Sequence, residues 1–212
     1  MTALLTVAVV LVVGWFAVGS IWNVRKGSAT LKWLREALPA LGEKTTLRWL
    51  GTTSVEMVLS RAHSPFESAT LVIFLEPRDV PWLWALSRGR GRRDALIFRA
   101  RPRQAPVHNL EAFDPESWPA RDARRRIAAE AWPAREPLAT AGLTVFAKAD
   151  DDFPFAESLL EIAGRSGIRV RRLSVRSADP NLALHVDLPG APTPAAPFIG
   201  ALRAIGERAM KP

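Results

Sequence analysis

The longest uninterrupted apolar run in the sequence lies at its N-terminal end. Residues Ala3 to Trp22 include no charged side chain. As a helix rising about 1.5 Å per residue, this run extends about 30 Å, the thickness of the hydrocarbon core of a bilayer. A helix also satisfies its own backbone hydrogen bonds, so it can cross lipid. The run predicts a transmembrane anchor over residues 1–24, with residues 3–22 in contact with the lipid bilayer.

A cleaved signal peptide and a buried core helix are the two alternatives to an anchor. No basic residue precedes the apolar run in this sequence, and the run is longer than the apolar region of most signal peptides. Twenty uncharged residues at the start of a chain are also unusual for a helix in a globular core. We therefore favour the anchor.

Basic residues after the apolar run predict its orientation. Arg25 and Lys26 follow the run directly, and Lys32 and Arg35 come soon after. Positively charged residues next to a span are retained on the cytoplasmic side. The sequence therefore predicts a single-pass protein of the plasma membrane with its N-terminus outside and residues 25–212 in the cytoplasm.

The first half of the soluble part contains one helical pattern and several strand patterns. Leucines spaced three and four apart predict a helix over Ala29–Leu41. Two Thr- and Val-rich segments, Thr45–Leu50 and Ser54–Ala62, predict a hairpin, and the apolar Ala69–Leu75 predicts a strand buried on both faces. Less regular patterns follow. They predict a short helix at Val80–Ser87, a loop at Arg88–Arg93 and a strand at Asp94–Arg101. Beyond this strand they predict an extended connection at Pro102–Pro119 and a helix at Trp118–Trp132.

The C-terminal third has the more regular patterns. They predict a strand at Leu143–Ala149, a helix at Phe153–Arg165, strands at Ile168–Val175 and Leu182–Leu188, and a helix at Ala196–Met210. The order strand, helix, strand, strand, helix is part of the split βαβ, ferredoxin-like arrangement. A similar order in 29–101 and 142–210 suggests a pseudo-repeat of half-units. We predict an α+β fold with a mainly antiparallel sheet; a doubly wound α/β fold is the alternative, disfavoured because the strands come in hairpin-like pairs.

Composition narrows the class of protein. Hydrophobic residues make up 48% and charged residues 24%, which excludes a wholly disordered chain. The absence of cysteine excludes disulfides and thiolate chemistry, and it agrees with a reducing compartment. The net charge is +8, from 29 basic and 21 acidic residues. Because no phosphate-binding loop, zinc-protease or hydrolase motif is present, the sequence predicts no cofactor.

Two groups of acidic residues are the candidates for carboxylate chemistry. Asp150, Asp151 and Asp152 follow a predicted strand and could bind Mg²⁺, although we favour capping of the next helix because adjacent residues do not converge. Glu76 and Asp79 follow the most buried strand and could line a pocket, although we favour an ordinary turn. Enzymatic activity therefore stays an alternative.

The histidines provide little support for catalysis. His63 and His108 fall in predicted loops, each apart from other candidate residues. His185 and Asp187 lie two apart on one strand face and could pair, but an exposed polar face explains both. A catalytic histidine needs an orienting partner and a nucleophile, and the sequence has no pattern for either.

Outside the anchor, the feature that most indicates a contact with the membrane is a tryptophan-rich segment followed by arginines, in residues 82–93. Tryptophan next to arginine is typical of segments that lie on an anionic membrane surface. An apolar core helix followed by a solvated loop is the interpretation that we favour slightly. The residues that would contact the membrane are Trp82, Trp84, Arg88, Arg90, Arg92 and Arg93.

The predicted function follows from these observations. A second arginine run, Arg121–Arg126, contains an acid and has no aromatic residue between its arginines, so nucleic-acid binding is disfavoured. We expect a membrane-anchored interaction or scaffold module with an unidentified protein partner. The alternatives are an enzyme with a carboxylate-based site, with or without Mg²⁺, and a sensor of anionic membrane surfaces.

Overall fold

A single antiparallel sheet organises the chain. The computed structural model describes residues 2–130, 132, 138–140, 142–179, 181–189 and 193–211. Within these residues nine strands form one sheet in the order β1-β2-β3-β4-β9-β8-β5-β7-β6, and each strand is antiparallel to its neighbours. The strands are β1 Gly42–Trp49, β2 Ser54–Ala62, β3 Phe66–Phe74, β4 Ala95–Pro102, β5 Leu110–Phe113, β6 Leu138–Thr140, β7 Leu143–Ala147, β8 Val170–Val175 and β9 Leu182–Asp187.

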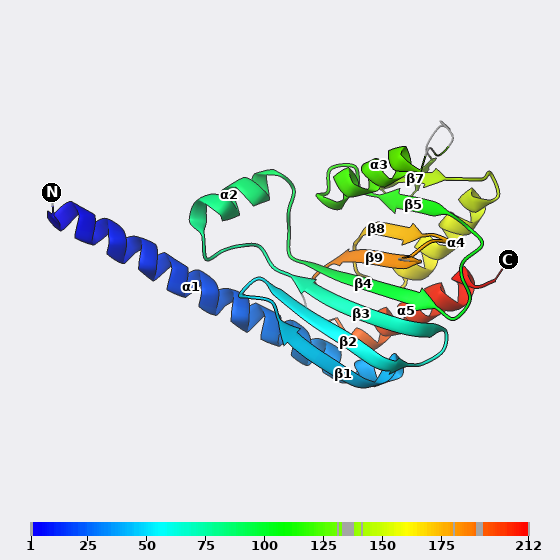
Figure 1. Cartoon of the computed structure of the whole chain (residues 1–212), viewed down its shortest axis with the longest axis horizontal. Coiled ribbons are helices and arrows are strands. Elements are labelled where there is room, and N and C mark those ends of the chain that lie inside the picture. Colours follow the sequence, from blue (N-terminus) through cyan, green and yellow to red (C-terminus); the bar gives the residue numbers. More distant parts are fainter. Residues whose placement is uncertain are drawn as a thin grey trace.

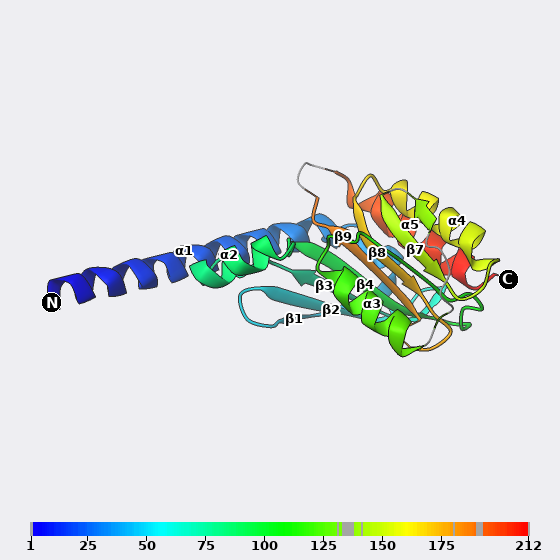
Figure 2. The same cartoon turned by 90° about the horizontal axis from the view of Figure 1, so that it is seen from above.

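Helices cover both faces of this sheet to different extents. The C-terminal part of α1 packs on one face together with α4 and α5, whereas α3 lies on the other face (Figures 1 and 2). The helices are α1 Thr2–Arg35, α2 Pro81–Gly89, α3 Pro119–Ala129, α4 Asp152–Gly164 and α5 Ala195–Ala209, with a 3₁₀ turn at Leu38–Ala40. The α+β class predicted from the sequence is confirmed.

The main core lies between the sheet and the face covered by α1, α4 and α5. Alternate residues of each strand point toward it, so Met57 of β2 lies between Leu47 of β1 and Leu71 of β3. Phe98 of β4 and Phe66 of β3 meet edge to face, with ring centres 5.3 Å apart. Burial of this apolar surface at about 25 cal/mol per Å² is the main force that holds the helices on the sheet.

The two halves of the chain build the sheet differently. Strands β1 to β4 form a simple meander in sequence order. In the second half α4 connects β7 to β8, and β5 lies between these two strands and antiparallel to both. This second half contains a split crossover. In the first half α2 lies between β3 and β4, but these two strands are adjacent and antiparallel, so no helix crosses over between separated strands and the predicted ferredoxin-like half-repeats are not confirmed.

Several predicted elements need correction. The separate helix expected at Ala29–Leu41 is the continuation of α1, which runs without a break from Thr2 to Arg35. The connection expected at 102–119 contains β5, a strand at the centre of the second half. Helix α3 ends at Ala129, before the predicted Trp132, and residue 131 lies outside the described residues.

Strand β8 does not alternate regularly between the two faces of the sheet. The pairing of β8 with β9 shifts register between Val170 and Arg172, which is typical of a β-bulge. The shift moves Leu173 and Val175 to the core face, while Arg172 and Ser174 point to the face covered by α3. A strict alternation therefore cannot describe this strand.

The face under α3 is held by buried charges. The carboxylate of Glu111 on β5 is fully buried and accepts hydrogen bonds from Arg172, Arg176 and Ser174 at 2.7–3.1 Å. Arg172 also donates to Asp122 of α3 at 2.9 Å. A buried carboxylate is tolerated only when it is paired and hydrogen-bonded, so this cluster fixes α3 on the sheet.

His185 lies on this covered face and not on the exposed polar face that the sequence predicted. Its side chain is buried below Trp118, with ring centres 6.1 Å apart, and Asp187 pairs with Arg171 instead. Burial lowers the pKa of His185 to about 3, and the nearby Arg172, Arg99 and Arg126 contribute to the lowering while Asp122 opposes it. His185 is therefore neutral at physiological pH.

This lowered pKa predicts acid destabilisation of the folded domain. The unfolded chain takes up a proton at His185 below a pH of 6.5, but the folded chain does so only near 3. The free energy of unfolding should therefore fall by about 2 to 3 kcal/mol between pH 6.5 and about 4.5. Urea unfolding of the full chain in maltoside micelles, followed by tryptophan fluorescence, measures this loss.

His185→Gln should remove most of the pH dependence in this range, because glutamine does not titrate. His63→Gln is the control, since His63 is exposed and its removal should leave the dependence in place. An unchanged pH dependence in His185→Gln would contradict the assignment.

Candidate functional site

Helix α1 has one half outside the domain and one half packed on it. Every residue from Thr2 to Val18 is exposed, whereas Gly19, Asn23, Gly27, Thr30 and Leu34 are buried. The buried positions are three or four residues apart and form one stripe along the helix. By length and composition α1 is able to cross a membrane, and only 6% of its most apolar window is buried in the protein.

A buried cluster of charges surrounds the base of the exposed half of α1. Arg78 donates to both carboxylate oxygens of Asp94, at 2.9 and 2.8 Å, and to Glu76 at 3.0 Å. Asp94 also accepts the backbone N–H of Glu76 at 2.7 Å. Burial opposes ionisation of Asp94, but these hydrogen bonds and the one from Lys26 outweigh it and lower its pKa. Asp94 therefore stays charged at neutral pH.

Three side chains of α1 join this cluster directly. Lys26 binds Asp94 at 2.5 Å, and Asn23 both donates to the carbonyl of Glu76 and accepts from Arg78. Trp15 donates its indole N–H to the carbonyl of Arg78 at 2.9 Å. We refer to Trp15, Asn23, Lys26, Arg78 and Asp94 as the anchor clamp.

A glycine allows the helix to approach the clamp. A Cβ at Gly19 would lie 2.3 Å from the carbonyl oxygen of Arg78 and 2.6 Å from the Cα of Asp79. Only glycine therefore fits where α1 crosses the segment 76–79. The contact is between backbones, so it fixes the position of α1 more tightly than side chains alone would.

Helix α2 lies next to the exposed half of α1. A hollow of about 290 Å³ separates them and is lined by Trp15, Val18 and Trp22 of α1 and Trp84 of α2. Every residue of α2 is at least partly exposed, and Trp82, Leu83 and Leu86 expose 67%, 44% and 51% of their surface. This exposure contradicts the interpretation of the segment as an apolar core helix.

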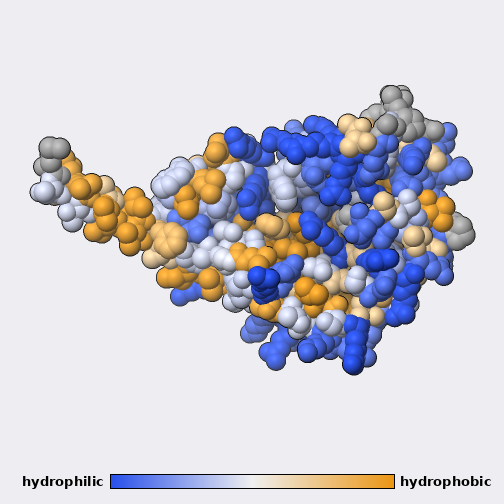
Figure 3. All heavy atoms as spheres, in the orientation of Figure 1, coloured by the Kyte–Doolittle hydropathy of each residue, from blue (hydrophilic) through white to orange (hydrophobic). Residues whose placement is uncertain are grey.

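The exposed apolar residues are concentrated at one end of the molecule. Figure 3 shows hydrophobic surface along the projecting end of α1 and over part of α2, with less hydrophobic surface between the two and hydrophilic surface over α3. Isolated exposed apolar residues are common in soluble proteins, but a concentration of them at one end marks an interaction or membrane site.

The six residues that the sequence grouped as a membrane contact separate into two sets. Trp84 and Arg88 donate to the buried Glu76, at 2.7 Å and at 3.0 and 3.2 Å, although half of the Arg88 side chain stays exposed. Trp82, Arg90 and Arg93 are exposed, and Arg92 is partly buried with its guanidinium 5.8 Å from the Phe74 ring. Arg25 is exposed, whereas Lys26 is engaged in the anchor clamp.

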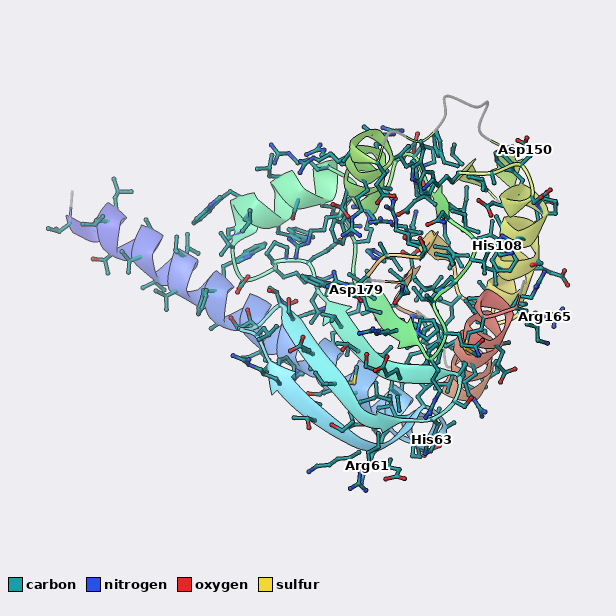
Figure 4. The ribbon with its side chains drawn as sticks, turned by 45° about the vertical axis from the view of Figure 1, so that its right-hand side comes forward. Arg61, His63, His108, Asp150, Arg165 and Asp179 are labelled. Atoms are coloured by element: carbon teal, nitrogen blue, oxygen red, sulfur yellow. The ribbon has the colours of Figure 1, made fainter. Side chains whose placement is uncertain are left out.

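The predicted carboxylate sites do not form a common centre. Within the part of the chain that the structure describes, no three His, Asp or Glu side chains lie close enough together to hold a metal ion. Asp152 is buried and accepts the N–H of Ala149, while Asp151 is exposed and Asp150 lies near the beginning of α4 (Figure 4). Asp79 accepts a hydrogen bond from Thr52 at 2.7 Å and not from the groups around Glu76.

His108 is not the isolated loop residue that the sequence suggested. Its Nδ1 lies 2.7 Å from Asp152 Oδ1, and its ring stacks on Phe155 at 3.9 Å. This pair joins the β4–β5 connection to α4 at the end of the domain opposite the projecting part of α1 (Figures 1 and 4). Sequence reasoning found neither this pair nor the role of Asp94, because their partners are distant in the chain.

Comparison with known proteins assigns no relationship. Neither a protein family nor a curated protein sequence matches this chain.

The anchor clamp predicts that α1 tolerates substitution at one glycine and not at another. Gly19→Leu should push α1 away from Arg78 and lower the free energy of unfolding by about 1 to 3 kcal/mol, as in other overpacked contacts. At Gly14 a new Cβ would meet no described atom within 4 Å, so Gly14→Leu should leave the stability unchanged or slightly raised. Thermal unfolding of the full chain in maltoside micelles measures both; equal effects of the two substitutions would contradict the clamp.

Proposed function

We propose that this chain is a single-pass protein of the plasma membrane whose α+β domain lies in the cytoplasm, docked on the bilayer by α1 and α2, and serves as an interaction or scaffold module. The single observation that supports docking most is the exposed apolar surface of α2 beside the exposed half of α1. A tether alone would leave the domain free to tumble, whereas two adjacent helices in contact with lipid would fix its orientation.

The length of the exposed part of α1 supports a shared depth for α1 and α2. The uncharged run Ala3–Trp22 rises about 30 Å as a helix, which is the thickness of a hydrocarbon core. The last part of this run, residues 15–22, lines the hollow next to α2. Lipid around residues 15–22 would also surround the exposed side of α2.

The anchor clamp supports a helix that is retained and not cleaved as a signal sequence. Removal of residues up to Trp22 would break the bond from Trp15 to Arg78 and the close contact of Gly19 with the segment 76–79. It would also uncover the apolar side of Trp84. A folded domain that uses its N-terminal helix in this way gains stability from keeping it.

The basic residues after the span support the cytoplasmic orientation. Arg25, Lys32 and Arg35 are exposed on the part of α1 that follows the apolar run. Exposed positive charges so close to a span are retained on the cytoplasmic side. Lys26 adds less to this effect, because Asp94 neutralises it.

The pairing of the acidic residues favours a scaffold over an enzyme. Glu76, Asp94 and Glu111 are buried and each binds at least two basic groups, which leaves them occupied as structural partners. The acids that would build an alternative carboxylate site lie at separate ends of the domain. These contacts explain why each acid is present without a substrate.

Docking predicts that α2 lies at lipid depth. The chain has no cysteine, so Trp82→Cys and Val107→Cys each give a single labelling site. Trp82 and Val107 are 67% and 68% exposed, and they differ in their distance from the anchor. With a nitroxide label and the full chain in lipid nanodiscs, the position 82 label should collide more with oxygen than with a water-soluble nickel complex, and the position 107 label should show the reverse. Two aqueous profiles would contradict docking.

The orientation is tested separately in intact cells. Val107→Cys should react with a membrane-impermeant maleimide only after the cells that express the full chain are permeabilised, because the domain faces the cytoplasm. Equal labelling before and after permeabilisation would place the domain outside and contradict this part of the proposal.

A further inference from the structure

A groove lined by arginines runs between α2 and α3. It has a volume of about 520 Å³, and its walls come from the end of α2, the loop that follows it and the first turns of α3. Two carboxylates, Glu116 and Asp122, also line it. The arginines of this arginine groove are Arg90, Arg92, Arg121, Arg124 and Arg125.

The backbone holds the two walls of the groove together. Gly91 has a φ of 78°, and a Cβ at this position would lie 2.6 Å from the carbonyl oxygen of Glu116. The loop can therefore approach the start of α3 only because residue 91 is glycine. This contact places Arg90 and Arg92 opposite the arginines of α3.

Aromatic rings support two of these arginines, and the other three remain available. The guanidinium of Arg92 lies 5.8 Å from the ring of Phe74, and that of Arg124 lies 5.7 Å from the ring of Phe113. Among the residues that the structure describes, Arg90, Arg121 and Arg125 make no ion pair. The groove therefore presents positive charge that no ion pair among the described residues neutralises.

The carboxylates in the groove do not compensate this charge. Asp122 is already bound by Arg172 at 2.9 Å and by Arg126 at 3.3 Å, and neither arginine lines the groove. Glu116 alone faces the five guanidinium groups as a further acid. An anionic ligand would supply the missing negative charge, and guanidinium groups bind phosphate through two parallel hydrogen bonds.

One side of the groove is apolar. Leu83 and Leu86 of α2 line it, and the same helix forms the hollow next to α1. A small soluble anion would make no apolar contact with these leucines. A phospholipid carries both a phosphate and apolar acyl chains, and the chains begin within a few ångströms of the phosphate.

We propose that the arginine groove binds the headgroup phosphate of an anionic phospholipid, with the first carbons of its acyl chains against Leu83 and Leu86. This inference rests on the proposed docking, which brings the groove to the level of the headgroups. The ligand is a lipid of the membrane that α1 crosses, and the site adds a defined pocket to a general attraction of basic residues to anionic membranes.

The experiment uses the full chain in dodecyl maltoside micelles. Native mass spectrometry measures binding of dioctanoyl phosphatidylglycerol, dioctanoyl phosphatidylcholine and inorganic phosphate. We expect the anionic lipid to bind about tenfold or more tightly than the zwitterionic lipid, because groove arginines attract its net charge. Inorganic phosphate should neither bind with comparable affinity nor displace the anionic lipid at equal concentration.

Two double variants locate the site. Arg121→Gln with Arg125→Gln should weaken binding of phosphatidylglycerol about tenfold, and so should Arg90→Gln with Arg125→Gln, which removes one charge from each wall. Arg61→Gln with Arg165→Gln is the matched control, because it removes the same charge from exposed positions away from α2 and α3 (Figure 4). Its affinity should equal that of the unmodified chain.

The outcomes separate this inference from the proposed docking. If the label at position 82 reports lipid but both anionic and zwitterionic lipids bind equally, or the groove variants bind like the control, the groove site is wrong and docking stands. If inorganic phosphate competes as well as the lipid, the ligand is a soluble phosphate and the lipid assignment is wrong. If the label at position 82 reports water, the docking fails whatever the lipid titration gives.

Discussion

The ion pair of Arg78 with Asp94, completed by Lys26, is the interaction on which the arrangement of anchor and domain depends. It joins α1, the segment after β3 and the start of β4 at one point. Because Asp94 and Glu76 are almost fully buried, loss of one partner would leave a charge without compensation, at a cost of about 3 to 5 kcal/mol. The same pair lets α1 continue unbroken from the domain, so the direction in which the apolar half projects is fixed by the sheet.

Much of the fold could be predicted because the apolar pattern of most segments agrees with the burial of their side chains in the structure. The helices α4 and α5 follow the periodicity of their apolar residues, β3 follows a continuous apolar run, and the hairpin β1–β2 follows two Thr- and Val-rich segments. Strand β5 follows no such pattern, since its four residues carry Glu111 at a fully buried position. That carboxylate is compatible with a strand interior only through Arg172 and Arg176, which lie more than sixty residues later in the chain. The pattern of apolar and polar residues does not show which distant side chains will pair.

The sequence predicted the two helices of the candidate site but not the contacts that join them. The apolar run and the tryptophan-rich α2 are both visible in the sequence, but their proximity depends on Gly19 and on the clamp. A signal for this contact existed in the spacing of Gly19, Asn23 and Gly27, which puts two small residues and an amide on one helix face. For Asp150–Asp152 the sequence favours capping of the next helix over a metal site. Asp152 accepts the N–H of Ala149 and pairs with His108, a partner that the sequence did not indicate, whereas Asp151 makes no side-chain capping hydrogen bond.

The net charge of +8 has a different meaning once the arginines are placed in the structure. Arg78, Arg172 and Arg176 are buried or nearly so and are matched by acids, so they contribute to the fold and not to attraction of a partner. The five arginines between α2 and α3 make no ion pair with any residue that the structure describes, and they adjoin the apolar end of the molecule. Field strength near a surface depends on such local excess more than on total charge, since solvent screens charges beyond about 10 Å. The anionic contact that we propose therefore lies at the groove between α2 and α3, beside the exposed apolar residues of α2.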